Sequence, residues 1–169
     1  GGVKVYLETL SNLSGVSGNE GQVRRALVDI LAGESSPDSS LTIRTDTLGN
    51  LLVHKPGCRR GPKVMLAAHM DEVALMIVGI DNKGYLKFKP IGGIDPRVLV
   101  AKTVQVGAKK IPGVIGSKPI HLQRPKERNQ AFTLQELQID IGVKSKEEAE
   151  KLVQLGDCAY FTTKYEEFG

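Results

Sequence analysis

The residues best suited to chemistry lie in one apolar stretch, "KVMLAAHMDEVALMIV" (63–78), which contains a histidine and two acids. In extended backbone, residues two apart project on the same side, so His69 and Asp71 are expected to be neighbours, with Glu72 on the opposite side. Such a pair suits an imidazole that binds a metal through one nitrogen and donates to a carboxylate through the other. On these residues alone, a core histidine hydrogen-bonded to Asp71 is the simpler interpretation.

Further metal ligands are scarce, and a catalytic zinc usually takes three from the protein. His54 follows an apolar strand pattern, which is typical of a surface histidine at a strand end. His121 lies in the turn-rich segment "SKPIHLQRP" and could face a cleft, but no cluster of carboxylates accompanies it. Glu166 and Glu167 are residues that could serve as a general base and a metal ligand, but their position near the chain end favours solvated charges. Spacing therefore leaves a metal site incomplete.

Nucleophilic and phosphate-binding sites find less support. The sequence has no G-x-S-x-G elbow and no G-x-x-x-x-G-K-[ST] loop. Cys58 is followed by two arginines, which could lower a thiol pKa, but neither cysteine has a neighbouring histidine. A Ser or Cys mechanism is therefore disfavoured.

Composition excludes several other classes of protein. The 169 residues carry 23 basic and 19 acidic side chains, a net charge of +4, and the basic segments 54–63 and 123–128 lack interleaved aromatic residues. Nucleic-acid binding is thus not expected. No apolar run approaches the ~20 residues of a membrane span, and the N-terminus lacks the pattern of a secretory signal. Two cysteines far apart in the chain favour a reducing, cytoplasmic location.

The first part of the chain mixes helix and strand patterns. Apolar residues at helical spacing predict a short helix ending near Ser11 and a second with its stripe over 23–31, with a Ser17–Glu20 capping box and Gly33 as its stop.

Three strand patterns follow these helices. "LTIRTD" (41–46) and "LLVHK" (51–55) predict two strands about the turn "TLGN". The uniformly apolar "KVMLAA" (63–68) predicts a strand buried on both faces of an α/β sheet, with His69 at its C-terminal end.

From Val73 to about Ile141 the pattern changes to short strands divided by turns. "ALMIVGI" (74–80) and "YLKFK" (85–89) predict a hairpin, and further strands are predicted in 102–107, 111–116 and 134–142. A helix capped by Ser145 and Glu148 and ended by Gly156 follows, and then a last strand in "CAYFTTKY". These elements predict a small β-barrel or sandwich with one helix.

Taken together, six motifs are similar to those of a known family. In chain order they are "GVSGNEGQVR", "DTLGN", "LAAHMDEVALM", "PIGGIDPRVL", "GVIGSKPIHL" and "IDIGVKSKEEAEKLVQLGD". They resemble the N-terminal half of the glutamyl/tetrahedral aminopeptidase family of co-catalytic metallopeptidases, and the resemblance extends from about Leu7 to Phe161.

The resemblance implies a fold, an activity and site residues. It implies an α/β catalytic domain that holds two divalent metal ions, zinc or cobalt, and removes N-terminal residues from peptides. A small, PDZ-like β-barrel is inserted in it and serves dimerisation and assembly, up to a dodecamer. By this resemblance His69 binds metal, and Asp71 is a catalytic-site residue that orients the His69 ring. The expected domains are 1–72 (catalytic), 73–162 (inserted barrel) and 163–169 (return to the catalytic domain).

The chain departs from the family in its length. Family members are longer, and their remaining ligands follow the inserted domain, so by that pattern they would lie beyond Gly169 and would not be Glu166 or Glu167. A smaller departure is Ala74, where the family often has glycine.

We therefore expect the N-terminal fragment of a cytoplasmic, homo-oligomeric metalloaminopeptidase that is inactive by itself. It would act on peptides and have no nucleic-acid or membrane partner. The alternative is a non-catalytic assembly module. A third interpretation, an endoglucanase, is disfavoured because the sequence has no tryptophan and no convincingly placed pair of carboxylates.

Overall fold

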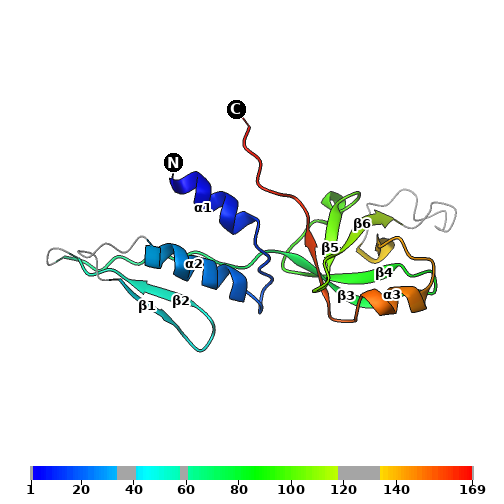
Figure 1. Cartoon of the computed structure of the whole chain (residues 1–169), viewed down its shortest axis with the longest axis horizontal. Coiled ribbons are helices and arrows are strands. Elements are labelled where there is room, and N and C mark those ends of the chain that lie inside the picture. Colours follow the sequence, from blue (N-terminus) through cyan, green and yellow to red (C-terminus); the bar gives the residue numbers. More distant parts are fainter. Residues whose placement is uncertain (1, 34–40, 58–60, 118–133, 169) are drawn as a thin grey trace. The chain divides into compact units, whose positions relative to one another are not determined.

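The computed structural model describes residues 2–33, 41–57, 61–117 and 134–168 (Figure 1). The chain divides into two units: Gly1–Glu72 together with Tyr165–Gly169, and Val73–Lys164. We call them unit 1 and unit 2 and describe each by itself. No helix in the described ranges combines the length and apolar character needed to cross a membrane.

The described residues of unit 1 form two helices and a two-stranded sheet. The helices are α1 (Gly2–Ser11) and α2 (Gly21–Gly33), and the strands are β1 (Thr42–Thr45) and β2 (Leu51–His54). The strands pair antiparallel, with Thr42 opposite His54 and Thr45 opposite Leu51. Arg24 on α2 donates from Nη1 to the Gly49 carbonyl in the turn between them, at 2.8 Å. Both predicted helices and the hairpin are confirmed.

The start of α2 differs in detail from the prediction. The Glu20 carboxylate accepts from the Gly18 N–H at 2.6 Å, where the sequence predicted a reciprocal capping box with Ser17. The difference arises because residues 17–18 form a turn, in which Gly18 has a positive φ of 87° and its N–H lies close to Glu20. The helix ends at Gly33, as predicted.

The prediction of a buried strand at 63–68 is wrong for the described structure. This segment forms neither helix nor strand, and Val64, Met65 and Leu66 are 82%, 87% and 94% exposed. A buried strand needs neighbours that satisfy its backbone N–H and C=O groups on both sides. In the described ranges the only sheet of unit 1 is the β1–β2 pair, which offers the segment no such neighbour.

Unit 2 is a closed six-stranded barrel, as the pattern of short strands predicted. Its strands are β3 (Ala74–Ile80), β4 (Leu86–Ile91), β5 (Thr103–Val106), β6 (Ile111–Ser117), β7 (Leu137–Asp140) and β8 (Cys158–Phe161), joined in the order β3-β4-β7-β6-β5-β8. All strand pairs are antiparallel. In the described residues the connections include the short 3₁₀ helices η1 (Pro96–Val98) and η3 (Leu134–Glu136) and the helix α3 (Lys146–Leu152).

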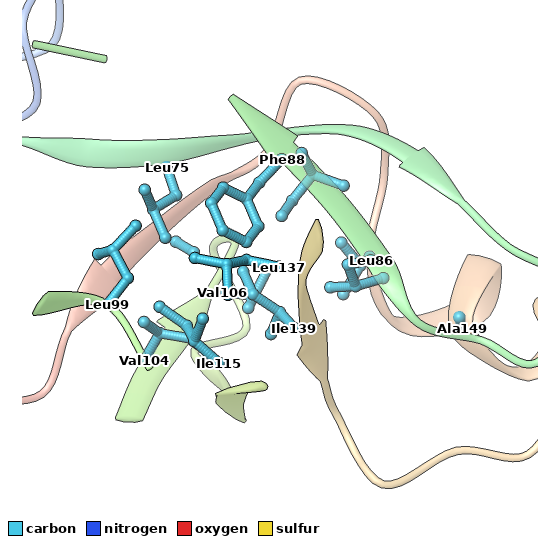
Figure 2. Close-up of a cluster of buried hydrophobic side chains, with 13 residues drawn as sticks. Leu75, Leu86, Phe88, Leu99, Val104, Val106, Ile115, Leu137, Ile139 and Ala149 are labelled. Carbon is cyan, nitrogen blue, oxygen red and sulfur yellow. The ribbon is translucent and has the colours of Figure 1, made fainter. Parts of the chain in front are cut away.

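Alternation along the strands fills the barrel. On β3, Leu75 and Ile77 are buried whereas Met76 and Val78 are exposed, and on β7 Leu137 and Ile139 are buried. Figure 2 shows such side chains from different strands pointing toward one another in a single cluster. Because closure pairs every strand on both sides, the barrel leaves no sheet edge open.

Helix α3 begins at the predicted cap. The Ser145 hydroxyl accepts from the Glu148 N–H at 3.2 Å, and the Glu148 carboxylate accepts from the Lys144 N–H at 2.9 Å. The helix buries Ala149 against the barrel core and ends at Leu152, before the predicted stop at Gly156. Gly156 instead has a φ of 90° in the turn that leads to β8.

Candidate functional site

His69 and Asp71 are in contact in unit 1. The Nδ1 atom of His69 lies 2.9 Å from the backbone carbonyl oxygen of Asp71 and 3.2 Å from its Oδ1. A carbonyl oxygen can only accept, so in the neutral ring this contact requires the hydrogen on Nδ1. The Nε2 atom then keeps its lone pair, and the side chain of His69 is 85% exposed. The ring is thus held in the tautomer of an Nε2 metal ligand.

The contact combines two parts of Asp71. The sequence predicted that the two side chains would be neighbours, and the structure places them so. The backbone carbonyl is nevertheless the nearer group, and the carboxylate, 41% exposed, adds a negative charge beside the ring. The roles of His69 as ligand and Asp71 as its orienting acid stay predictions.

Glu72 connects this segment to the loop before α2. The Glu72 N–H donates to the Gly15 carbonyl at 2.7 Å, and the Gly15 N–H donates to Glu72 Oε1 at 3.1 Å. Val16 and Glu72 form an isolated parallel bridge. The sequence predicted that Glu72 would face away from His69, but it gave no sign of what Glu72 would contact.

The described ranges supply one candidate ligand rather than a complete metal site. No group of three or more His, Cys, Asp or Glu side chains occurs within them. His54 is an exposed residue at the end of β2, as predicted, and Glu166 and Glu167 are exposed. Cys58 and His121 lie outside the described residues. The chemistry of the described donors therefore fits a metal at His69 Nε2, with the other ligands still to be supplied.

An ion pair in unit 2 was not anticipated. Asp95 accepts from the Arg97 backbone N–H at 2.9 Å and from its guanidinium at 2.6–3.0 Å. These hydrogen bonds, chiefly those from the side chain, lower the pKa of Asp95 from 3.8 to about 2. Because Asp95 is the N-cap of η1, the pair shapes the turn in "PIGGIDPRVL".

Cys158 has the properties of a structural thiol. Burial first, and the charge of Asp157 second, raise the pKa of Cys158 above its ordinary value. A raised pKa keeps the thiol protonated at neutral pH and lowers its reactivity. This agrees with the weak support for a cysteine nucleophile in the sequence.

Comparison with known proteins gives consistent matches. The family model for M42 glutamyl aminopeptidase matches residues 49–169. The lysyl aminopeptidase of Pyrococcus furiosus is 39% identical over 142 residues, which are 82% of this chain and 39% of that protein.

Two solved structures illustrate the likeness of fold. A Thermotoga maritima protein described as an endoglucanase has 38% identity and a TM-score of 0.74, over 96% of this chain and 46% of that chain. The TET1 peptidase of Pyrococcus horikoshii has 34% identity and a TM-score of 0.74, over 94% of this chain and 46% of that chain. That peptidase can assemble into a tetrahedron or a large octahedral shell.

This chain spans less than half the length of these relatives. The family model covers the His69–Asp71 segment and the whole of the barrel. Of the six motifs on which the resemblance rests, the last four, from "LAAHMDEVALM" to "IDIGVKSKEEAEKLVQLGD", lie wholly within the residues that the family model matches. The chain belongs to the M42 glutamyl aminopeptidase family, a family of peptidases.

Proposed function

We propose that the protein containing this chain is a metal-dependent aminopeptidase that removes N-terminal residues from peptides. His69 binds a divalent metal ion through Nε2, and Asp71 orients the ring. The observation that carries the proposal is the hydrogen bond from His69 Nδ1 to the Asp71 carbonyl, which leaves an exposed Nε2 lone pair. Membership of the M42 family supports the reaction class.

The proposed site holds two divalent ions, zinc or cobalt. Bound together, such ions supply a water of lowered pKa for attack on the scissile carbonyl. In this chain His69 provides one ligand atom, and the Asp71 carboxylate provides a negative charge that stabilises the ring as a ligand. The other ligands belong to sequence that corresponds to the part of the relatives this chain does not match.

The exposed apolar segment 64–66 supports the same proposal. Its residue types favour a strand, but none of the described residues pair with it or cover it as a sheet neighbour would. A catalytic sheet completed by further sequence would bury this segment immediately before His69. The 169-residue chain alone is therefore expected to bind zinc weakly and to hydrolyse no aminoacyl substrate. Stoichiometric zinc retained through dialysis, together with activity, would contradict this.

The test is hydrolysis of aminoacyl-p-nitroanilides by the protein that contains this chain, after chelation and reloading with zinc or cobalt. We expect activity to depend on the metal and to be lost in His69→Ala. The matched control is His54→Ala, which removes an exposed imidazole of unit 1 and should leave activity unchanged. Full activity after chelation, or in His69→Ala, would refute the proposal. Cleavage of a β-glucan in place of the peptides would favour the endoglucanase description.

We further propose that the barrel is the inserted, PDZ-like assembly domain, and that the chain forms homo-oligomers. An open groove on the barrel, lined by residues that include Thr103, Pro112, Val114, Ile141 and Thr162, carries this second proposal. Val114 is 46% exposed within it, and the related TET1 peptidase assembles into large shells.

The size of the chain in solution, by light scattering, tests this proposal. Val114→Arg should shift an oligomer toward the monomer, and Val78→Arg is the control because Val78 is similarly exposed, at 43%, but does not line the groove. A monomeric wild-type chain would overturn the proposal. Assembly of the containing protein without any peptidase activity would favour the non-catalytic alternative.

A further inference from the structure

We infer that Glu72 is a positioning residue for His69, acting through the peptide group that joins Asp71 to Glu72. The inference rests on the proposed function for its significance, because it takes the His69 ring to be a working ligand. The hydrogen bonds on which the inference is based are observed independently of that function. Two hydrogen bonds meet at this peptide group, one on each side, and the Glu72 side chain secures one of them.

The first step is the peptide group itself. Its N–H, that of Glu72, donates to the Gly15 carbonyl at 2.7 Å, and its C=O, that of Asp71, accepts from His69 Nδ1 at 2.9 Å. A trans peptide is planar, with its N–H and C=O pointing in opposite directions. Fixing the N–H on Gly15 therefore fixes the direction of the carbonyl that selects the tautomer of His69. Hydrogen bonds linked through one amide also polarise each other in the same sense.

The second step is the carboxylate of Glu72. Its Oε1 accepts from the Gly15 N–H at 3.1 Å, so Glu72 binds both the N–H and the C=O of Gly15. A single backbone bond would let the segment pivot about its axis. Two bonds to one residue oppose that rotation.

The third step is the anchor. Gly15 is buried, and a Cβ on it would lie 2.6 Å from Val23 Cγ2 on α2 and 3.4 Å from the Met70 carbonyl oxygen. Only a glycine allows the loop to pass this close to both. Val16 next to it is 3% exposed, so the anchor belongs to the small apolar core of unit 1. The contacts of Glu72 with Gly15, and of Gly15 with α2, therefore fix the position of His69 relative to α2.

The experiment measures the tautomer of His69 in the 169-residue chain by nitrogen-15 NMR of the imidazole rings, at a pH where they are neutral. The exposed His54 ring serves as an internal reference. Three variants are compared. Glu72→Ala removes the acceptor, Glu72→Gln keeps an Oε1 acceptor without charge, and Glu20→Ala removes an equivalent bond, from the Gly18 N–H to a carboxylate, elsewhere in unit 1.

We expect His69 to be mainly the Nδ1–H tautomer in the wild type, in Glu72→Gln and in Glu20→Ala. In Glu72→Ala the ratio of Nε2–H to Nδ1–H should rise about 2- to 10-fold, the range that one hydrogen bond is worth. The Gly15 amide should also exchange faster in that variant. A merely structural role of Glu72 would speed the exchange without moving the tautomer ratio.

Three results would overturn the inference: an unchanged ratio in Glu72→Ala, an equal rise in Glu20→Ala, or a wild-type ring without preference for Nδ1–H. Failure of the proposed function is separable, because it would appear as metal-independent activity of the containing protein and would leave the tautomer ratios as they are.

Discussion

Replacement of Leu75 by alanine should destabilise the barrel strongly. Leu75 is 0% exposed, and its strand is paired on both sides, opposite Pro90 of β4 and Ala159 of β8. The change removes three carbons, and at about 0.8 kcal/mol per buried carbon the transfer from water accounts for about 2.4 kcal/mol. A closed barrel cannot collapse into the vacated volume, so the cavity brings the total loss to about 3–5 kcal/mol of the free energy of unfolding.

The assay must report on the barrel alone, because the chain consists of two units and a single transition for both cannot be assumed. Amide exchange measured by mass spectrometry in increasing urea, for peptides from residues 73–164, meets this need. For a domain with about 5–15 kcal/mol of stability, the expected loss is roughly a fifth or more of the total. The urea midpoint of these peptides should fall accordingly.

Met76→Ala provides the control on the same strand. Met76 is the next residue, faces outward and is 38% exposed, so its truncation should cost less than about 1 kcal/mol. A loss below about 1 kcal/mol in Leu75→Ala, or equal losses in the two variants, would refute the view that closure and interior packing stabilise unit 2.

Three further predictions follow from the geometry. Amides of β1 and β2 should exchange faster than those of the barrel, because a two-stranded sheet is only marginally stable by itself. Unit 1 also has little core: of the buried apolar side chains in the described ranges, only Val16 and Val23 lie in it. Slower exchange in the β1–β2 hairpin than in the barrel would contradict this prediction. Arg97→Ala should raise the pKa of Asp95 from about 2 toward 3.8 in an NMR titration. Since the folded-state value is the lower one, the contribution of this pair is complete above about pH 3.8 and is lost as pH falls through about 2. Cys158 should react slowly with iodoacetamide at pH 7 and much faster in urea, because burial raises its pKa; equal rates would show that the thiol is open to solvent.

The barrel was largely predictable from local pattern. Alternation over 137–140 distinguishes inward from outward side chains, whereas 74–80 carries no polar side chain and shows only that a strand is favoured; the intervening turn residues mark the hairpins. The order in which the strands close was not predictable. Pairing of β4 with β7 and of β3 with β8 joins segments far apart in the chain, and no local signal encodes such a choice.

The segment 63–68 shows the opposite case. Its apolar run predicts burial on both faces, but burial depends on neighbours as well as on the residues themselves. In the described structure those neighbours are missing and the side chains are exposed. The apolar pattern therefore predicts the environment in which this segment would be stable as a strand. It does not by itself predict that the segment forms a strand.

The site shows where spacing is informative and where it is not. The H-x-D spacing predicted that His69 and Asp71 would meet through their side chains, yet the nearer contact is the Asp71 carbonyl, a group that every residue type possesses. Sequence alone cannot reveal such a contact, because it depends on the orientation of one peptide plane. That orientation is set by Gly15, more than fifty positions earlier, through bonds to Glu72. The carboxylate of Asp71 then supplies negative charge beside the ring, and the backbone carbonyl of Asp71 selects the tautomer of His69. A histidine that looked like half of a side-chain pair is thus held by a chain of contacts that begins at α2.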